Sequence, residues 1–163
     1  MTAPRFGGIR AALTAGLAGF SCMAAELTAV RLQAPWFGDS AYVWTNVIGV
    51  ILAALSGGAA LGGILAARPD ARRQVVGLAI VSGLLLAVIP LLAAPLGRWL
   101  LPQDLPLDVA MAAIVRGSLV ATALLFAPSM LLLGAIGPLL VTTLTREGVA
   151  VGKAAATVSS AGT

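Results

Sequence analysis

Hydrophobic residues fill four long stretches of this chain, and short polar or turn-forming segments separate them. The stretches cover roughly residues 9–32, 41–67, 75–101 and 109–145. A helix needs about 20 predominantly apolar residues to cross about 30 Å of hydrocarbon. A shorter apolar run over residues 152–163 looks like the start of another helix. The pattern therefore predicts an all-α, polytopic helical membrane domain with four transmembrane helices plus the start of a fifth.

The last of the four stretches is longer than one perpendicular crossing requires. It contains Pro128 and, further on, Gly134, Gly137 and Pro138. A proline lacks a backbone N–H and clashes with the preceding turn, so helices kink or break there. We expect either one long tilted helix or a helix broken near Pro128 or Pro138. Broken helices line the binding sites of transporters, whereas in other membrane proteins such prolines are kinks that neighbouring helices accommodate.

Composition agrees with the bilayer as solvent. Hydrophobic residues make up 60% of the chain and charged residues 10%, with a mean hydropathy of +1.03. The net charge of +4 comes from basic residues that fall mostly between the apolar stretches, so we interpret it as an orientation signal and expect no nucleic-acid partner. The chain has no His and a single Cys, which excludes a His general base, His-ligated haem and most zinc sites within it. We expect no cofactor, no metal site and no catalytic residue.

Basic residues at the ends of the stretches predict the orientation in the membrane. One predicted side carries Arg5, Arg10, Arg68, Arg72, Arg73, Arg146 and Lys153. The other carries Arg31 and Arg98. Because cytoplasmic loops are enriched in Lys and Arg, we expect a cytoplasmic N-terminus. The turn-rich segments at residues 33–40 and 102–107 would then be outward-facing loops.

Small residues repeat at four-residue spacing along the second stretch. They form two neighbouring ridges, Gly49–Ala53–Gly57 and Ala54–Gly58–Gly62. Small residues let helix backbones approach closely, which is the main packing device in lipid. The ridges predict a tightly packed helix partner in this chain, in another membrane subunit or in a second copy. The alternative is a moving interface, as in a transporter.

Charged and amide side chains inside the stretches are candidate functional residues, because ionisable groups in a bilayer are costly and usually paired or functional. Glu26 lies near the end of the first stretch, and Arg116 lies in the early part of the fourth. At 1.5 Å per residue both lie roughly 8–10 Å below the outer surface, so we expect an ion pair between them. Arg31 is a competing partner. Asn46 could hydrogen-bond across helices or contact a ligand, and a substrate or proton site at Glu26 is the functional alternative.

Residues 26–63 read ELTAVRLQAPWFGDSAYVWTNVIGVILAALSGGAALGG. This block resembles the N-terminal membrane domain of the membrane-bound spermidine synthase-like proteins, a bacterial family often labelled as fused transporter-like and spermidine synthase. The matching residues are Glu26, Arg31, Leu32, Ala34, Pro35, Phe37, Gly38, Ser40, Tyr42, Trp44, Thr45 and residues 47–50. A second set that resembles later helices of the family consists of residues 126–129, Gly134, Pro138, Gly152 and residues 159–163.

The resemblance implies a membrane module of such a protein, located in the inner (cytoplasmic) membrane of a bacterium. The family's aminopropyltransferase domain, a Rossmann-like fold with a Gly-rich cofactor loop, has no counterpart in this sequence, so the enzyme label is not carried over. We expect a non-catalytic module that anchors or assembles with a partner enzyme, further membrane subunits or copies of itself. The alternative is a transport module for a small cation such as a polyamine, bound through Glu26.

Overall fold

The computed structural model of the chain describes residues 5–68, 70–101 and 107–163, and these residues form an all-helical fold. The helices are α1 (Arg5–Phe37), α2 (Ala41–Leu65), α3 (Ala71–Leu100), α4 (Leu107–Leu125), α5 (Ala127–Arg146) and α6 (Val151–Gly162). Four of them, α1, α2, α3 and α5, are long and apolar enough to cross a membrane. The expected class, a polytopic helical membrane domain, is therefore confirmed.

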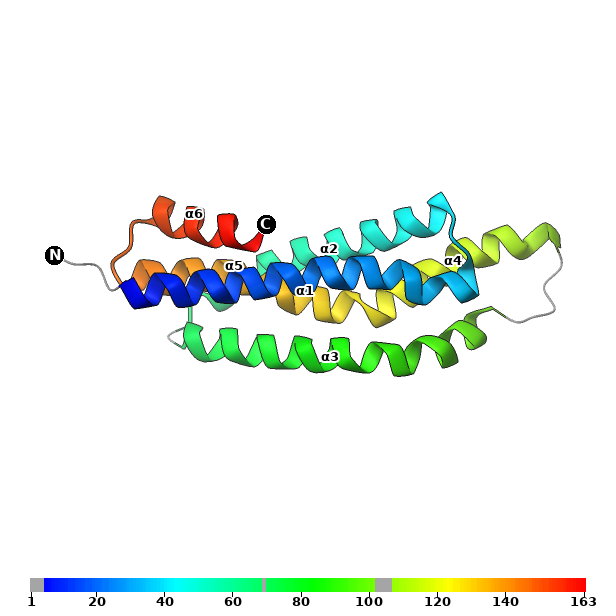
Figure 1. The fold of residues 1–163 in the computed structure, drawn as a ribbon, viewed down its shortest axis with the longest axis horizontal. Coiled ribbons are helices and arrows are strands. Elements are labelled where there is room, and N and C mark those ends of the chain that lie inside the picture. The colour runs from blue at the N-terminus through cyan, green and yellow to red at the C-terminus, as the bar shows by residue number, and fades with distance from the viewer. Residues whose placement is uncertain (1–4, 69, 102–106) are drawn as a thin grey trace.

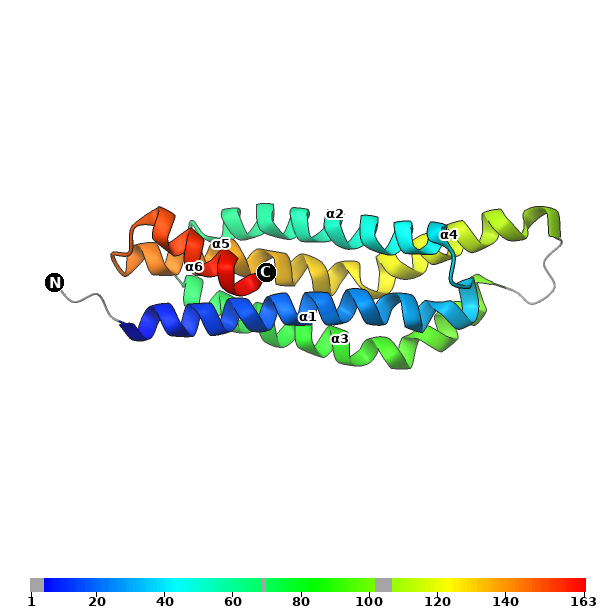
Figure 2. The same ribbon diagram turned by 45° about the horizontal axis from the view of Figure 1, so that its top comes forward.

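The long helices lie side by side along one axis of the molecule (Figure 1). α5 touches every other described helix and supplies much of the core, including Met130, Ile136, Leu139 and Leu144. α4 continues the line of α5 toward one end of the bundle, and α6 returns beside α1 (Figures 1 and 2). The side chain of Ala154 is fully buried where α6 packs. The core is thus a layer of helices around α5.

Large apolar side chains remain exposed along the outer faces of the long helices. On α3 they recur as Val76, Ile80, Leu84, Val88 and Leu91. In water such a surface would be a liability, but hydrocarbon chains solvate it as well as protein does. The fold therefore indicates contact with a lipid bilayer.

The segments richest in arginine meet at one end of the bundle. The turn from α2 to α3 and the turn from α5 to α6 lie at the same end as the start of α1 (Figure 1). The connection from α1 to α2 and the end of α3 lie at the opposite end. This arrangement matches the grouping of basic residues in the sequence. The side that faces the cytoplasm stays a prediction.

The first helix continues beyond its expected end at Leu32. α1 runs through Pro35 to Phe37, so the loop expected at residues 33–40 contains only residues 38–40. Burial explains the difference, because Gln33 and Phe37 are almost completely buried against other helices. The turn itself uses Gly38 at φ +77°, a conformation that favours glycine. Ser40 then caps α2 by accepting a hydrogen bond from the backbone N–H of Val43.

The fourth apolar stretch is two helices rather than one. The interruption lies at Phe126, directly before α5, and Pro128 occupies the first turn of that helix, where its missing N–H costs little. The alternative of a break near Pro128 is thus confirmed. A break at Gly134, Gly137 or Pro138 is wrong, because α5 continues through all three. Close packing of Gly134 against the backbone of Leu55 holds this part of α5 to α2.

Candidate functional site

Buried polar side chains converge where α1, α2 and α4 meet. The Nε2 atom of Gln33 on α1 donates a hydrogen bond of 2.9 Å to Oγ1 of Thr122 on α4. Gln33 is 1% exposed and Thr122 is fully buried. The hydroxyl of Thr122 in turn donates to the carbonyl oxygen of Ser118, one turn earlier, at 2.7 Å. These bonds join α1 to α4.

The network continues from α4 to α2 through an amide. Nδ2 of Asn46 donates hydrogen bonds of 2.8 Å to Oγ of Ser118 and to the carbonyl oxygen of Val115. Asn46 therefore makes the interhelical hydrogen bond that its position predicts. Such bonds in membrane proteins average about 0.6 kcal/mol and reach about 1.7 kcal/mol. The network thus clamps three helices, and its amide and hydroxyl donors are used within the protein.

Sequence reasoning missed three members of this network, namely Gln33, Ser118 and Thr122. Gln33 was assigned to a loop because Pro35 and Gly38 follow it. A signal was nevertheless present, since Gln33 lies four residues after Ala29 and therefore on the same helical face. Ser118 and Thr122 also share that four-residue spacing. Polar residues at four-residue spacing on an apolar helix indicate hydrogen bonding to another helix.

The structure does not bring Glu26 and Arg116 together. Glu26 is half-buried on α1, and its Oε1 lies 3.9 Å from the Cys22 sulfur, which donates to it. Arg116 and Arg31 are both exposed. Among the described residues no ion pair joins Glu26 to either arginine. Similar depth in the membrane does not bring these two side chains together, because α4 is rotated so that Gly117 and Ser118 face inward and Arg116 lies on the outer side.

One of the two small-residue ridges on α2 makes a backbone-to-backbone contact with α5. A Cβ at Gly58 would collide with the carbonyl oxygen of Leu131, and one at Gly62 would lie 2.5 Å from that of Ala135. Gly134 on α5 is equally close to Leu55 on α2. The helices approach so closely because each contact has a glycine on one helix, which leaves no side-chain carbon between the two backbones.

The other ridge on α2 faces away from the core. Gly49 has open space where its side chain would be, and Ala53 is exposed. The closest atom that a Cβ at Gly57 would meet, Cδ1 of Leu131, is 4.0 Å away. Gly49 and Ala53 therefore have no packing partner within the described part of the chain.

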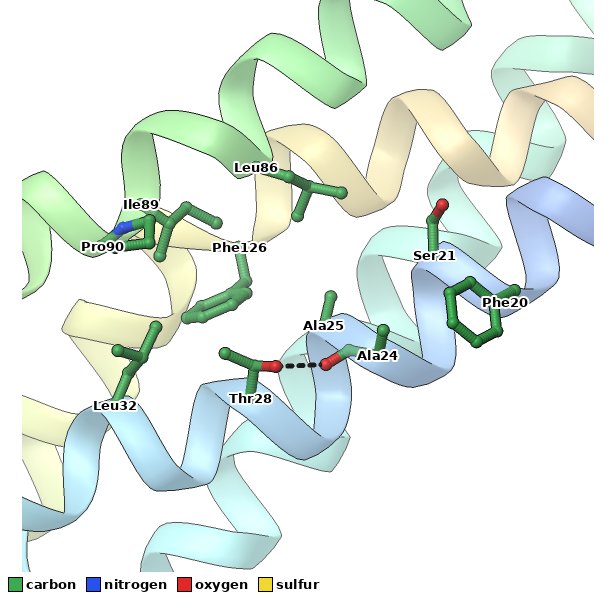
Figure 3. Close-up of a pocket in the computed structure, with 10 residues that line it drawn as sticks. All are labelled: Phe20, Ser21, Ala24, Ala25, Thr28, Leu32, Leu86, Ile89, Pro90 and Phe126. Carbon is green, nitrogen blue, oxygen red and sulfur yellow. Dashed lines mark hydrogen bonds between the residues drawn. The ribbon is translucent and has the colours of Figure 1, made fainter.

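A pocket of about 260 Å³ lies between α1 and α3 (Figure 3). The ring of Phe126 lies between the two helices, with Leu32 on one side and Ile89 on the other (Figure 3). The lining is almost entirely apolar, since the hydroxyls of Ser21 and Thr28 donate to carbonyl oxygens of their own helix. Such a pocket fits a hydrocarbon group and not a cation.

Comparisons with known proteins add no further assignment. The sequence matches no protein-family model, no curated protein and no solved structure. Within the described residues, no three or more Asp, Glu or Cys side chains form a group that could hold a metal ion. The function is therefore argued from the helix contacts and the sequence resemblance alone.

Proposed function

We propose that this chain is a non-catalytic membrane module of the spermidine synthase-like kind, which anchors or assembles with further transmembrane partners. The observation that supports it most is the use of polar side chains inside the bundle. Gln33, Thr122, Ser118 and Asn46 bond to one another across three helices, and none of them lines either of the hollows between α1 and α3. The intramembrane polar groups thus do structural work.

The surface that suits assembly is the outer ridge of α2, defined by Gly49 and Ala53. The inner ridge shows how closely this helix packs when small residues meet a partner, because Gly58 and Gly62 touch the backbone of α5. Gly49 and Ala53 offer the same small side chains to the bilayer. A transmembrane helix of a partner subunit or of a second copy could approach there equally closely.

Variants of the outer ridge test this proposal. Gly49→Leu and Ala53→Leu should lower the recovery of the assembled complex several-fold after mild detergent extraction, while each variant keeps the thermal stability of the isolated chain. Ala59→Leu is the matched control for Ala53→Leu, because it makes the same substitution at an exposed position of α2 outside both ridges. Native mass spectrometry measures the fraction of assembled protein. Equal assembly of all three variants and the wild type would exclude the outer ridge as the contact.

Transport of a small cation such as a polyamine is the second candidate. One observation favours it: the carboxylate of half-buried Glu26 forms no ion pair within the described residues, so it is available to a ligand. On this proposal Glu26→Gln would retain the fold and abolish polyamine binding, measured by isothermal titration with spermidine in detergent. Glu147→Gln is the control, because that carboxylate lies against Gly7 at the start of α1, far along this helix from Glu26. Either of two results would exclude this role. The first is no binding of spermidine by the wild type, and the second is equal binding by the wild type and Glu26→Gln.

A further inference from the structure

A second and larger cavity lies between α1, α3 and α5 at the arginine-rich end of the bundle. Its volume is about 650 Å³. The polar part of its lining consists of Arg10, Thr14, Arg72, Thr143 and Glu147. The apolar part includes Leu13, Val75, Val76 and Leu140, which lie further from the ends of the helices. The cavity is therefore amphipathic, with charge at the bundle end and hydrocarbon toward the middle.

The two arginines of this cavity differ from the arginine next to it. Arg146 donates from its guanidinium to the carbonyl oxygens of Ala66 and Arg68 and so caps the end of α2. In contrast, Arg10 and Arg72 are exposed, and their guanidinium groups make no hydrogen bond or ion pair with any residue that the structure describes. Their donors remain available for an anion.

The third charged group in the cavity sets the net charge. The carboxylate of Glu147 lies directly over Gly7 of α1, where a Cβ would collide with it. Two arginines and one glutamate leave the lining with one net positive charge. A ligand with a single negative charge would neutralise it. A zwitterionic ligand would not.

A smaller, apolar hollow lies further along the same two helices, away from the arginine-rich end. The cavity lies between α1 and α3, and the pocket of about 260 Å³ lies between the same two helices further along (Figure 3). Phe20 and Ala24 line that pocket from α1, and Leu86 and Ile89 line it from α3. We use the name α1–α3 crevice for these two hollows together.

We propose that the α1–α3 crevice binds one anionic phospholipid. Its phosphate would lie between Arg10 and Arg72, because guanidinium groups bind phosphate oxygens through two parallel hydrogen bonds. One acyl chain would extend along α1 and α3 toward the apolar hollow beside Phe126. Basic pockets between transmembrane helices are typical sites for anionic head groups. Anionic lipids are abundant in the cytoplasmic leaflet, and the basic end of a membrane protein usually lies at that leaflet.

The experiment compares lipids with matched acyl chains. The full chain is purified in detergent that contains equal amounts of phosphatidylglycerol and phosphatidylcholine, and native mass spectrometry counts the retained lipid. We expect one phosphatidylglycerol per chain, in about tenfold excess over phosphatidylcholine. Arg10→Gln with Arg72→Gln should remove this excess. Arg73→Gln is the control, because Arg73 is exposed on the same turn of α3 but does not line the cavity.

Either of two results of the lipid-retention experiment would overturn the proposal. The first is equal retention of the two lipids by the wild type. The second is an equal loss in Arg73→Gln, which would indicate attraction by the charge of the whole surface. A competition with millimolar glycerol 3-phosphate separates a lipid site from a phosphate site, because it should leave the bound lipid in place if the acyl chain contributes. Displacement by the soluble phosphate would also contradict the proposal.

A thermal measurement guards against effects on folding. Added phosphatidylglycerol should raise the unfolding temperature of the wild type and of Arg73→Gln, each relative to its own lipid-free value. The double variant should show no such rise, even if its own lipid-free value differs from that of the wild type. An equal rise in the double variant would contradict a site at the two arginines.

Discussion

The contact between α2 and α5 and the contact between α1 and α3 are opposite solutions to packing in lipid. Between α2 and α5, glycines bring the two backbones together, so a single Cβ at Gly58 or Gly134 has no room. Between α1 and α3, two hollows of about 650 and 260 Å³ separate the helices. The difference follows from side-chain size, because Leu13, Phe20, Val76 and Leu86 stand in the crevice where the first contact has glycine.

The α1–α3 pair does close at one end. The ring of Trp36 lies on Gly97, where a Cβ would collide with it, and Cζ of Arg98 is 5.8 Å from the ring centroid. Cation–π contacts of this kind contribute about 0.5–1 kcal/mol at exposed sites. The α1–α3 pair is therefore in close contact at the end opposite the arginine-rich segments. Close packing of α2 on α5 stabilises one side of the bundle, and the hollows of the α1–α3 crevice offer space on the other.

The largest expected effect tests the closed side of this comparison. In Gly58→Leu the new side chain would collide with the carbonyl oxygen of Leu131, so the two helix backbones must separate. Overpacking in a rigid core costs about 1–3 kcal/mol, and a backbone collision places this variant at the upper end. We expect loss of most folded protein, measured by recovery and thermal unfolding after detergent extraction.

Gly49→Leu is the matched control for Gly58→Leu, because Gly49 lies on the same helix with open space at its Cβ. Its thermal stability should stay close to that of the wild type. If both variants unfolded at the same temperature, the close approach of α2 and α5 would not explain the stability of the bundle.

A smaller effect tests the polar clamp that joins the two sides. Gln33→Met keeps the volume of the side chain but removes its hydrogen bond to Thr122, and Thr122→Val removes the other partner. A double-mutant cycle should give a coupling of about 0.6–1.7 kcal/mol, the range of hydrogen bonds between membrane helices. Chemical or thermal unfolding of the four proteins in one detergent measures it. A coupling of zero would mean that the two side chains do not interact in the bilayer.

The sequence predicts the helices well and their contacts only partly. Hydropathy is a sum over about 20 residues, so the four long apolar stretches are evident from the pattern, although the fourth is divided into α4 and α5. The end of α1 is not evident, because Pro35 and Gly38 are local signals that indicate a turn. The burial of Gln33 and Phe37, which extends the helix, depends on contacts with α2 and α4. Tertiary packing decided where this helix ends.

The ridges on α2 show the same limit. Gly49–Ala53–Gly57 and Ala54–Gly58–Gly62 have the same signature in the sequence, but only the second packs against α5. The rotation of a helix about its axis is set by all of its neighbours together, and small-residue spacing alone does not reveal it. The rotation of α4 likewise separates Arg116 from Glu26, although the sequence predicts similar depths for the two residues.

The smallest expected effect concerns that pair. Since no ion pair joins Glu26 to Arg116 in the described residues, the stability losses of Glu26→Gln and Arg116→Gln should add, with a coupling within about 0.5 kcal/mol of zero. Arg116→Gln should lower the stability little by itself, because Arg116 is exposed. Glu26→Gln should keep most of the contact with Cys22. Thermal unfolding of both single variants and the double variant in detergent provides the values. A coupling of several kcal/mol, the size expected when a buried charge loses its partner, would show that the two side chains meet in the bilayer.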